Sequence, residues 1–182
     1  QPDGTWETSV PAEAWKDGTI RQLFVNGRRR QRARTPNNGT LRTAGPLQPL
    51  GNRQEARRDP ETKRGFRFQP GDLEAWADWR QMTVVLYHSW TASIHWVETL
   101  NENDRTLTFT ARSGWPVGWW ETEQRYYIEN VRSALDQPGE WLADHKRRKL
   151  VYLPMPGETP DTVTSVVPVL PTLLELRGEA EA

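Results

Sequence analysis

Short alternating segments that end at glycine, proline or asparagine constrain the fold of this chain more than any other sequence feature. Residues 82–88 are mostly β-branched or aromatic, and in 93–98 and 105–110 large apolar residues alternate with their neighbours. A period of two is that of a strand with one buried face. Because the three segments follow one another closely, they predict an antiparallel meander.

The strongest local signal is a β-hairpin early in the chain. Leu23 and Val25 fall on one face of a predicted strand and Phe24 on the other, and Asn26-Gly27 follows directly. Asparagine and glycine supply the two positive φ angles of a type I′ turn, whose twist matches that of the flanking strands. Residues 20–34 are therefore expected to fold back on themselves at this turn.

The rest of the chain contains more elements of the same size. Further strands are predicted at Gly65–Phe68, Arg125–Ile128, Trp141–Asp144, Lys149–Leu153, Thr162–Val167 and Leu173–Leu176. Of these, Trp141–Asp144 and Lys149–Leu153 flank a basic turn and are expected to form a second hairpin. Short helical turns are expected after Asp72 and after Asn130, since both residue types cap helix N-termini well. The stretch from Thr43 to Arg64 is polar and rich in turn residues, so we expect an exposed loop there.

The size and spacing of these elements predict one domain over residues 1–182. A chain of 182 residues can bury a sizeable core but is short for two domains. Many short strands with turn residues between them are typical of β-sandwiches and small barrels. The expected fold is mostly β: an antiparallel β-sandwich or barrel-like domain with one to three short helices.

The charge balance and the rare residue types argue against several classes of function. The 24 basic and 24 acidic residues cancel, so no overall field draws the chain to nucleic acid or to an anionic membrane. No apolar run approaches the roughly 18 residues needed to cross a bilayer. With no cysteine, three histidines and no glycine-rich phosphate loop, we expect no metal, no cofactor, no nucleic-acid partner and no membrane contact.

Tryptophan is unusually frequent, with ten residues against four phenylalanines and four tyrosines. An indole brings a large apolar area and one N–H donor, so it suits cores, interfaces and flat sugar faces alike. Trp115, Trp119 and Trp120 lie so close in the sequence that they cannot all face one core. At least one of them is expected at a surface or at an interface with another domain.

His88 and Trp90 end a predicted strand and precede a loop, where site residues are often displayed. An imidazole at this place can donate to a sugar hydroxyl while the indole stacks on the sugar ring. The same two residues can equally form a hydrogen-bonded pair beneath the loop. Both interpretations stay open at the level of sequence.

Five arginines within seven residues, Arg28, Arg29, Arg30, Arg32 and Arg34, form a local basic cluster without an intervening acid. In an extended strand the even-numbered arginines share one face. Guanidinium groups match phosphate, sulfate and uronate oxygens well. The alternative is a charged strand edge that resists aggregation, or ion pairs with acids elsewhere in the chain.

Acidic residues near the tryptophans give no specific sign of an active site. Glycoside hydrolysis usually uses two carboxylates about 5 to 9.5 Å apart, and many acid pairs can meet that distance. Glu121, Glu123 and Glu129 are therefore interpreted first as surface charges. No residue is assigned a catalytic role.

Several stretches taken together resemble a known family. They are Arg21-Gln22-Leu23-Phe24-Val25-Asn26-Gly27, Arg32-Ala33-Arg34-Thr35-Pro36-Asn37, Pro70-Gly71-Asp72-Leu73, His88-Ser89-Trp90, Tyr126-Tyr127-Ile128-Glu129-Asn130-Val131, Leu135-Asp136-Gln137-Pro138-Gly139-Glu140-Trp141 and Val151-Tyr152-Leu153-Pro154. In that order they resemble the insertion domain of right-handed parallel β-helix enzymes similar to glycoside hydrolase family 141, whose members are described as α-L-fucosidases or xylanases. The resemblance covers nearly the whole chain.

This resemblance implies a domain inserted into a β-helix enzyme. Residues 1–19 and 168–182 would be the segments that connect it to the β-helix, which would carry the sugar-cleaving carboxylates and be the partner of this domain in the same chain. Such an enzyme is expected to act on a polysaccharide or oligosaccharide and to be secreted or periplasmic, of bacterial type. The chain begins with Gln1 and has no signal-peptide pattern, which fits a segment of a longer protein.

Three hypotheses about function follow. In the first, the chain is a non-catalytic accessory domain that helps to wall the substrate groove, with His88, Trp90 and Arg34 near the sugar. In the second, it is a stand-alone carbohydrate-binding module whose platform is formed by Trp115, Trp119 and Trp120. In the third, it is a complete hydrolase.

Overall fold

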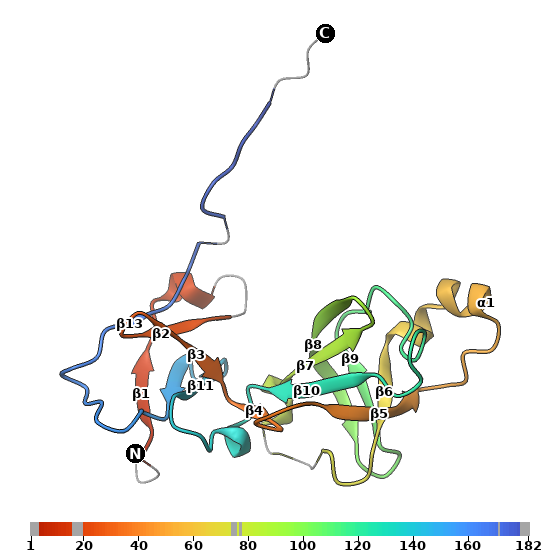
Figure 1. Ribbon diagram of the computed structural model, residues 1–182, viewed down its shortest axis with the longest axis horizontal. Helices are drawn as coiled ribbons and strands as arrows, with labels where there is room; N and C mark the ends of the chain where they lie inside the picture. The colour runs from red at the N-terminus through yellow and green to blue at the C-terminus, as the bar shows by residue number, and fades with distance from the viewer. Residues whose placement is uncertain (1–3, 16–19, 74–75, 77, 171, 179–182) are drawn as a thin grey trace.

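Two β units lie side by side in the structure, and the C-terminal segment extends away from both (Figure 1). This computed structural model describes residues 4–15, 20–73, 76, 78–170 and 172–178. The predicted fold class is confirmed. Most described elements are strands, and of the two expected architectures one unit forms a barrel.

The first unit is a closed barrel with one additional strand. Its strands are β4 (Arg34–Thr35), β5 (Leu41–Pro46), β6 (Gly65–Phe68), β7 (Thr83–His88), β8 (Thr91–Asn101), β9 (Thr106–Phe109) and β10 (Arg125–Glu129). They follow the order β4-β10-β5-β6-β9-β8-β7, and antiparallel pairing of β10 with β7 closes the ring. Closure leaves the six strands of the ring without open edges, which removes the tendency of strand edges to aggregate.

The second unit is a curled sheet. Its strands are β1 (Trp6–Ser9), β2 (Leu23–Val25), β3 (Arg28–Arg32), β11 (Glu140–Asp144), β12 (Lys149–Tyr152) and β13 (Ser165–Val166). They follow the order β1-β12-β11-β3-β2-β13, and β11 pairs with β3 in parallel while the other neighbours pair antiparallel. Strand β1 lies within the segment expected to be a connection at residues 1–19.

Helices are few and short. They are the α-helix α1 (Arg53–Arg58) and the 3₁₀ turns η1 (Ala12–Trp15), η2 (Pro60–Lys63), η3 (Trp79–Gln81) and η4 (Arg132–Ala134). No helix among the described residues has the length and apolar character that a bilayer crossing requires.

Alternation along the strands builds the barrel core. In β10, Tyr126 and Ile128 are fully buried, whereas Arg125, Tyr127 and Glu129 face outward and are only partly covered. The ring of Phe66 lies 4.7 Å from that of Tyr126 inside the barrel. The same period thus gives the barrel an apolar interior and leaves a polar and aromatic outer face on β10.

The predicted hairpins and the meander are confirmed. Asn26 and Gly27 have φ angles of 51° and 73°, as a type I′ turn requires, and β2 pairs antiparallel with β3. Strands β7, β8 and β9 are consecutive antiparallel neighbours. The later hairpin is present as β11 and β12.

The expectation for Thr43 to Arg64 is confirmed in part: more than half of its residues are exposed, but the stretch is not a loop. This stretch contains most of β5, the helix α1 and the turn η2. Thr43 is fully buried, and Ala56 and Thr62 are nearly so. Short elements held by backbone hydrogen bonds in a closed barrel need few apolar residues, which is why the low apolar content was misleading.

The two expected helix caps, Asp72 and Asn130, both make tertiary hydrogen bonds. Asp72 accepts a hydrogen bond from the Tyr126 hydroxyl at 2.8 Å, and part of the helix predicted after it lies outside the described residues. Asn130 adopts a φ of 66° and directs its amide to the backbone of Gln81 and Ala143. The 3₁₀ turn that follows is capped by Val131 without a side-chain hydrogen bond. Tertiary hydrogen bonds thus replace the local cap expected for Asn130.

The strand expected at Leu173–Leu176 is also absent. These residues form no strand in the described part of the tail, and the side chains of Leu173 and Leu176 are 90% and 87% exposed. Only Ser165–Val166 of the expected Thr162–Val167 strand forms ladder pairs, with β2. A segment with a strand pattern forms a strand only when it can pair with another strand, and none of the described strands pairs with 173–176.

Substitution of Gly65 by alanine is expected to lower the free energy of unfolding by about 1–3 kcal/mol. A Cβ at this position would overlap the backbone carbonyl of Leu107 in the neighbouring strand, so β6 and β9 would have to separate. The control is Gly114→Ala, whose Cβ would meet nothing within 4 Å. Urea denaturation of both variants tests this, and equal midpoints would contradict it.

Candidate functional site

Four of the six predicted contact residues meet in one aromatic cluster at an end of the barrel. Trp90 occupies the two-residue turn between β7 and β8, while Trp115, Trp119 and Trp120 lie in the segment between β9 and β10. The ring of Trp90 lies 4.6 Å from that of Trp120 and 6.2 Å from that of Trp115. We call these four residues the tryptophan cluster.

Backbone contacts hold the segment that carries three of these rings. The amide of Val117 donates to the carbonyl of Thr62 at 2.9 Å, and the amide of Gly118 donates to Oε1 of Gln124 at 2.8 Å. Val117 is fully buried. The segment is therefore anchored at its centre, between Trp115 and Trp119.

Helix α1 supports the cluster from another side with two arginines. The guanidinium of Arg57 lies 5.3 Å from the ring centre of Trp115, and that of Arg53 lies 5.7 Å from the ring centre of Trp119. Cations at this distance over an indole face are attracted by its quadrupole. These two arginines contact Trp115 and Trp119, and not the exposed rings of Trp90 and Trp120.

The exposed rings of the cluster present apolar surface to solvent. Trp90 is 64% exposed and Trp120 is 38% exposed, and their planes meet at 55° rather than stacking. An indole that another ring does not cover keeps a flat face available for a ligand. The expectation that at least one of Trp115, Trp119 and Trp120 lies at the surface is confirmed.

His88 lies beneath this cluster. Its side chain points into the barrel and only 4% of it is exposed. Its Nε2 lies 2.8 Å from Oγ of Ser93, and its Nδ1 accepts from Nε2 of Gln124 at 3.4 Å. Both ring nitrogens thus have partners inside the protein, so His88 supports the turn that carries Trp90.

A second histidine extends this buried network. Nε2 of His95 also lies 2.8 Å from Oγ of Ser93, and its Nδ1 lies 3.1 Å from the carbonyl of Ala111. Burial lowers the pKa of His88 below its ordinary value. Burial also lowers the pKa of His95, with a smaller contribution from His88. Both imidazoles are therefore held in the neutral form near neutral pH.

In an NMR titration of the folded chain, His88 and His95 are expected to titrate with midpoints below 6.5, the ordinary histidine value. The unfolded chain then binds protons more readily, so their contribution to stability is complete above about pH 6.5 and is lost as pH falls toward the folded values. The urea-unfolded chain is the control and should titrate near 6.5. Folded midpoints at or above that of the unfolded chain would contradict the buried network.

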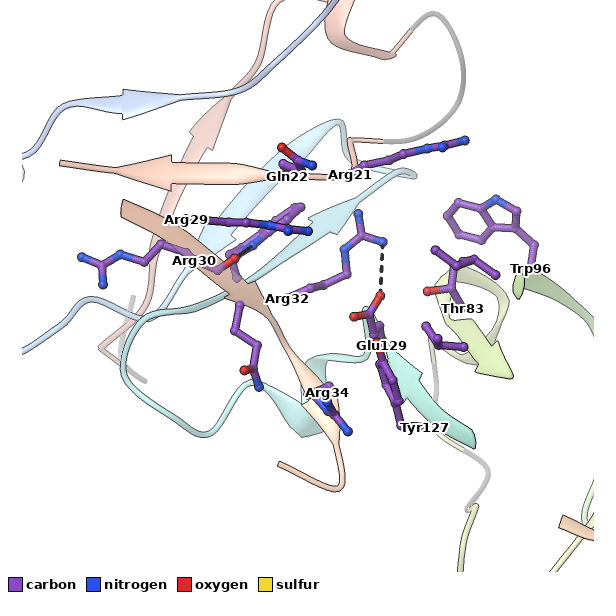
Figure 2. Close-up of a pocket in the computed structure, with 14 residues that line it drawn as sticks. Arg21, Gln22, Arg29, Arg30, Arg32, Arg34, Thr83, Trp96, Tyr127 and Glu129 are labelled. Carbon is purple, nitrogen blue, oxygen red and sulfur yellow. Dashed lines mark hydrogen bonds and ion pairs between the residues drawn. The ribbon is translucent and has the colours of Figure 1, made fainter. Parts of the chain in front are cut away.

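The arginine cluster borders a cleft of about 890 Å³ between the two units (Figure 2). The curled sheet contributes Arg29 and Arg32 to its lining, and the outer face of the barrel contributes Trp96, Tyr127 and Glu129. We call it the arginine cleft. Its volume lies within the range of typical ligand sites.

The arginines of the run have different partners. Arg30 forms an ion pair with Glu158 at 2.5 Å. Arg32 is buried, donates to the carbonyl of Ile20 and lies 4.0 Å from Glu129. The side chain of Arg29 is exposed and makes no hydrogen bond or ion pair with the described residues. Ion pairing, one of the two expected roles, thus accounts for part of the run.

Arg34, the remaining predicted contact residue, belongs to the arginine cleft and not to the tryptophan cluster. Its guanidinium lies 3.7 Å from the ring centre of Tyr127. Its Nε donates to the carbonyl of Pro36 at 2.9 Å, and a terminal nitrogen donates to the carbonyl of Gly39 at 2.6 Å. Arg34 is therefore fixed in position before any ligand arrives.

Glu129 is the one carboxylate among the described residues that line the arginine cleft. Burial raises its pKa above the ordinary value, although Arg32, Arg34 and Arg29 act in the opposite direction. Glu121, by contrast, is exposed at the surface and pairs with Arg42 at 3.1 Å. The acids named from the sequence therefore do not meet as a catalytic pair in this cleft.

Sequence reasoning missed Tyr127 and Trp96 as residues of the cleft. Both face outward on strands whose alternation is visible in the sequence. What the sequence does not show is that β3 lies opposite this outer face, since that depends on the long-range pairing of β3 with β11.

The fold is similar to one region of a larger solved structure. A solved structure described as a glycoside hydrolase superimposes with a TM-score of 0.62 and 19% sequence identity. The alignment covers 93% of this chain and 30% of that one, so the chain spans about a third of the length of the solved protein. Among proteins with curated descriptions, none matches the chain significantly.

The family itself is shown by a sequence model described as the GH141 insertion domain, which matches residues 4–155. The chain belongs to this family, as its sequence motifs led us to expect. The match begins just before β1 and ends shortly after β12. All strands of the barrel, and all strands of the curled sheet except β13, therefore lie within the insertion-domain match.

Proposed function

We propose that this chain is a non-catalytic insertion domain of a right-handed β-helix glycoside hydrolase and that it forms part of the wall of the substrate groove. The parent enzyme would be secreted or periplasmic and would degrade a polysaccharide. The observation that carries the proposal is the tryptophan cluster, which presents exposed indole faces on a rigid barrel end.

The acids around the arginine cleft support a non-catalytic role. Glycoside hydrolysis by the usual mechanisms needs a second carboxylate beside the first, and the described lining of this cleft provides Glu129 alone. Glu129 also faces Arg32 at 4.0 Å. A carboxylate surrounded by guanidinium groups is suited to electrostatic positioning and not to a two-carboxylate reaction.

The outer face of the barrel supports a role along an extended substrate. Tyr87 of β7 and Tyr127 of β10 face outward with ring centres 6.1 Å apart. Arg125 lies 5.4 Å from the ring centre of Tyr87. Tyr127 lines the arginine cleft, and Tyr87 lies beside it toward the turn that carries Trp90, because β7 runs from Thr83 at the cleft to His88 at the turn. A sugar chain can follow such a face over several residues.

In the full-length enzyme, Trp90→Ala is expected to lower kcat/KM by about one to two orders of magnitude, as loss of a contact of roughly 1–3 kcal/mol implies. The fold should be unaffected because Trp90 is mostly exposed. Trp90→Phe is the matched control: it keeps a ring and should retain most of the activity. Steady-state kinetics on the polysaccharide substrate provide the measurement.

The 182-residue chain alone should hydrolyse no aryl glycoside, before or after the substitution. Normal turnover by the Trp90→Ala enzyme would contradict the groove-wall function. Tight binding of the isolated chain to insoluble xylan, lost on substitution of Trp120, would show instead a stand-alone carbohydrate-binding module. Glycosidase activity of the isolated chain would refute the non-catalytic role.

A further inference from the structure

The arginine cleft has an excess of positive charge that its own acids do not neutralise. The side chains of Arg21 and Arg29 are exposed and make no hydrogen bond or ion pair with the described residues, and the guanidinium of Arg34 donates to backbone carbonyls. Arg32 faces Glu129 at the long distance of 4.0 Å. The whole chain carries equal numbers of acidic and basic residues, so this excess is a local property of the cleft.

The cleft holds its charged groups in place. The guanidinium of Arg32 lies 4.8 Å from the ring centre of Trp141, and its Nε has no hydrogen-bond partner among the described residues. Arg34 is fixed by two carbonyls and by the ring of Tyr127. Guanidinium groups that are already ordered lose little entropy when they bind an anion.

Aromatic and apolar residues of the barrel form the opposite side of the cleft. Trp96 and Tyr127 line it together with Ile94, which is 63% exposed. Burial, with smaller contributions from Glu129 and Tyr87, raises the pKa of Tyr127 to about 12, so its hydroxyl is neutral. A site with cations on one side and aromatic rings on the other suits a ligand that is a sugar ring with an acidic substituent.

We propose that the arginine cleft is a binding subsite for an acidic saccharide, whose carboxylate or sulfate oxygens are held by Arg29, Arg32 and Arg34. Figure 2 shows these three side chains on the side of the cleft formed by β3 and β4, with Arg32 directed at Glu129. The Glu129 carboxylate lies in the same cleft and would repel a second anionic group on the ligand. The inference rests on the proposed carbohydrate function and names the substrate class of that groove.

The test is calorimetric titration of the 182-residue chain with oligosaccharides of equal length. Oligogalacturonate and a sulfated xylo-oligosaccharide represent the two sources of acidic oxygens, and the unmodified xylo-oligosaccharide is the neutral comparison. At least one acidic ligand is expected to bind about tenfold or more tightly than the neutral one, the effect of one charge-assisted contact. Equal affinity for all three, or equally tight binding of inorganic polyphosphate, would overturn the proposal.

Two variants identify the site within the chain. Arg29→Gln should weaken binding of the acidic ligand about tenfold, while Arg28→Gln, its exposed neighbour outside the cleft lining, should change it less than twofold. Glu129→Gln should tighten binding because it removes the opposing charge. Thermal unfolding checks that each variant is folded. Equal weakening by Arg29→Gln and Arg28→Gln would overturn the assignment, as would weaker binding by Glu129→Gln.

The experiments distinguish failure of the acidic subsite from failure of the groove-wall function. If Trp90→Ala lowers the turnover of the full-length enzyme but Arg29→Gln leaves affinity for acidic ligands unchanged, the groove wall stands and the acidic subsite falls. If the isolated chain binds the acidic ligand but the full-length protein does not, another part of the protein covers the cleft, and the subsite is likewise overturned.

Discussion

One buried amide, that of Asn130, joins the barrel to the curled sheet. Its Nδ2 donates to the carbonyls of Gln81 and Ala143 at 2.8 and 3.0 Å, and its Oδ1 accepts from the amide of Ala143 at 2.8 Å. Its own backbone amide donates to the carbonyl of Ala33. A buried amide with all these partners is strongly specified, because any other arrangement would leave polar groups unpaired. The relative placement of the two units depends on this residue together with Gln81, whose Oε1 accepts from the backbone amide of His145 at 2.7 Å.

The arginine cleft follows from that placement. Asn130 ends β10 directly after Glu129, and Ala33 separates Arg32 from Arg34. Hydrogen bonds that fix Asn130 against Ala33 and Ala143 therefore also bring the outer face of β10 opposite β3. Burial lowers the pKa of Arg32 and raises that of Glu129, so each group is disfavoured in its charged form by its surroundings. A buried pair at 4.0 Å recovers little of that desolvation cost, and such local conflicts are expected at functional sites.

Local signals in the sequence predicted the hairpins and the meander well, because Asn26-Gly27 and the alternation in β8 and β9 act between close neighbours. The closure of the barrel by β10 and β7 depends on residues about forty positions apart and has no local signature. Helix α1 was missed because it buries only Ala56, so it shows no apolar period, although Asn52 caps it through the amide of Gln54.

The candidate site shows the same division. All four residues of the tryptophan cluster were named from the sequence, and Trp115, Trp119 and Trp120 are close in sequence. Their contact with Trp90 could not be predicted, because it depends on the pairing of strands in the barrel. His88 was named for its place at a strand end, and alternation from Val84 and Leu86 directs it inward. A polar residue can be buried only if it has hydrogen-bond partners. The partners of His88, Ser93 and Gln124, come from other parts of the chain, so its burial is difficult to predict from the sequence.

A crystal structure of the full-length protein with an acidic oligosaccharide bound tests the central claim most directly. The account predicts that the sugar chain runs between this domain and the rest of the protein, with a ring against Trp90 or Trp120 and an acidic group beside Arg29. It also predicts that the two carboxylates flanking the scissile bond lie outside residues 4–155, the family match. A sugar bound far from both the tryptophan cluster and the arginine cleft, or Glu129 within hydrogen-bond distance of the glycosidic oxygen, would contradict it.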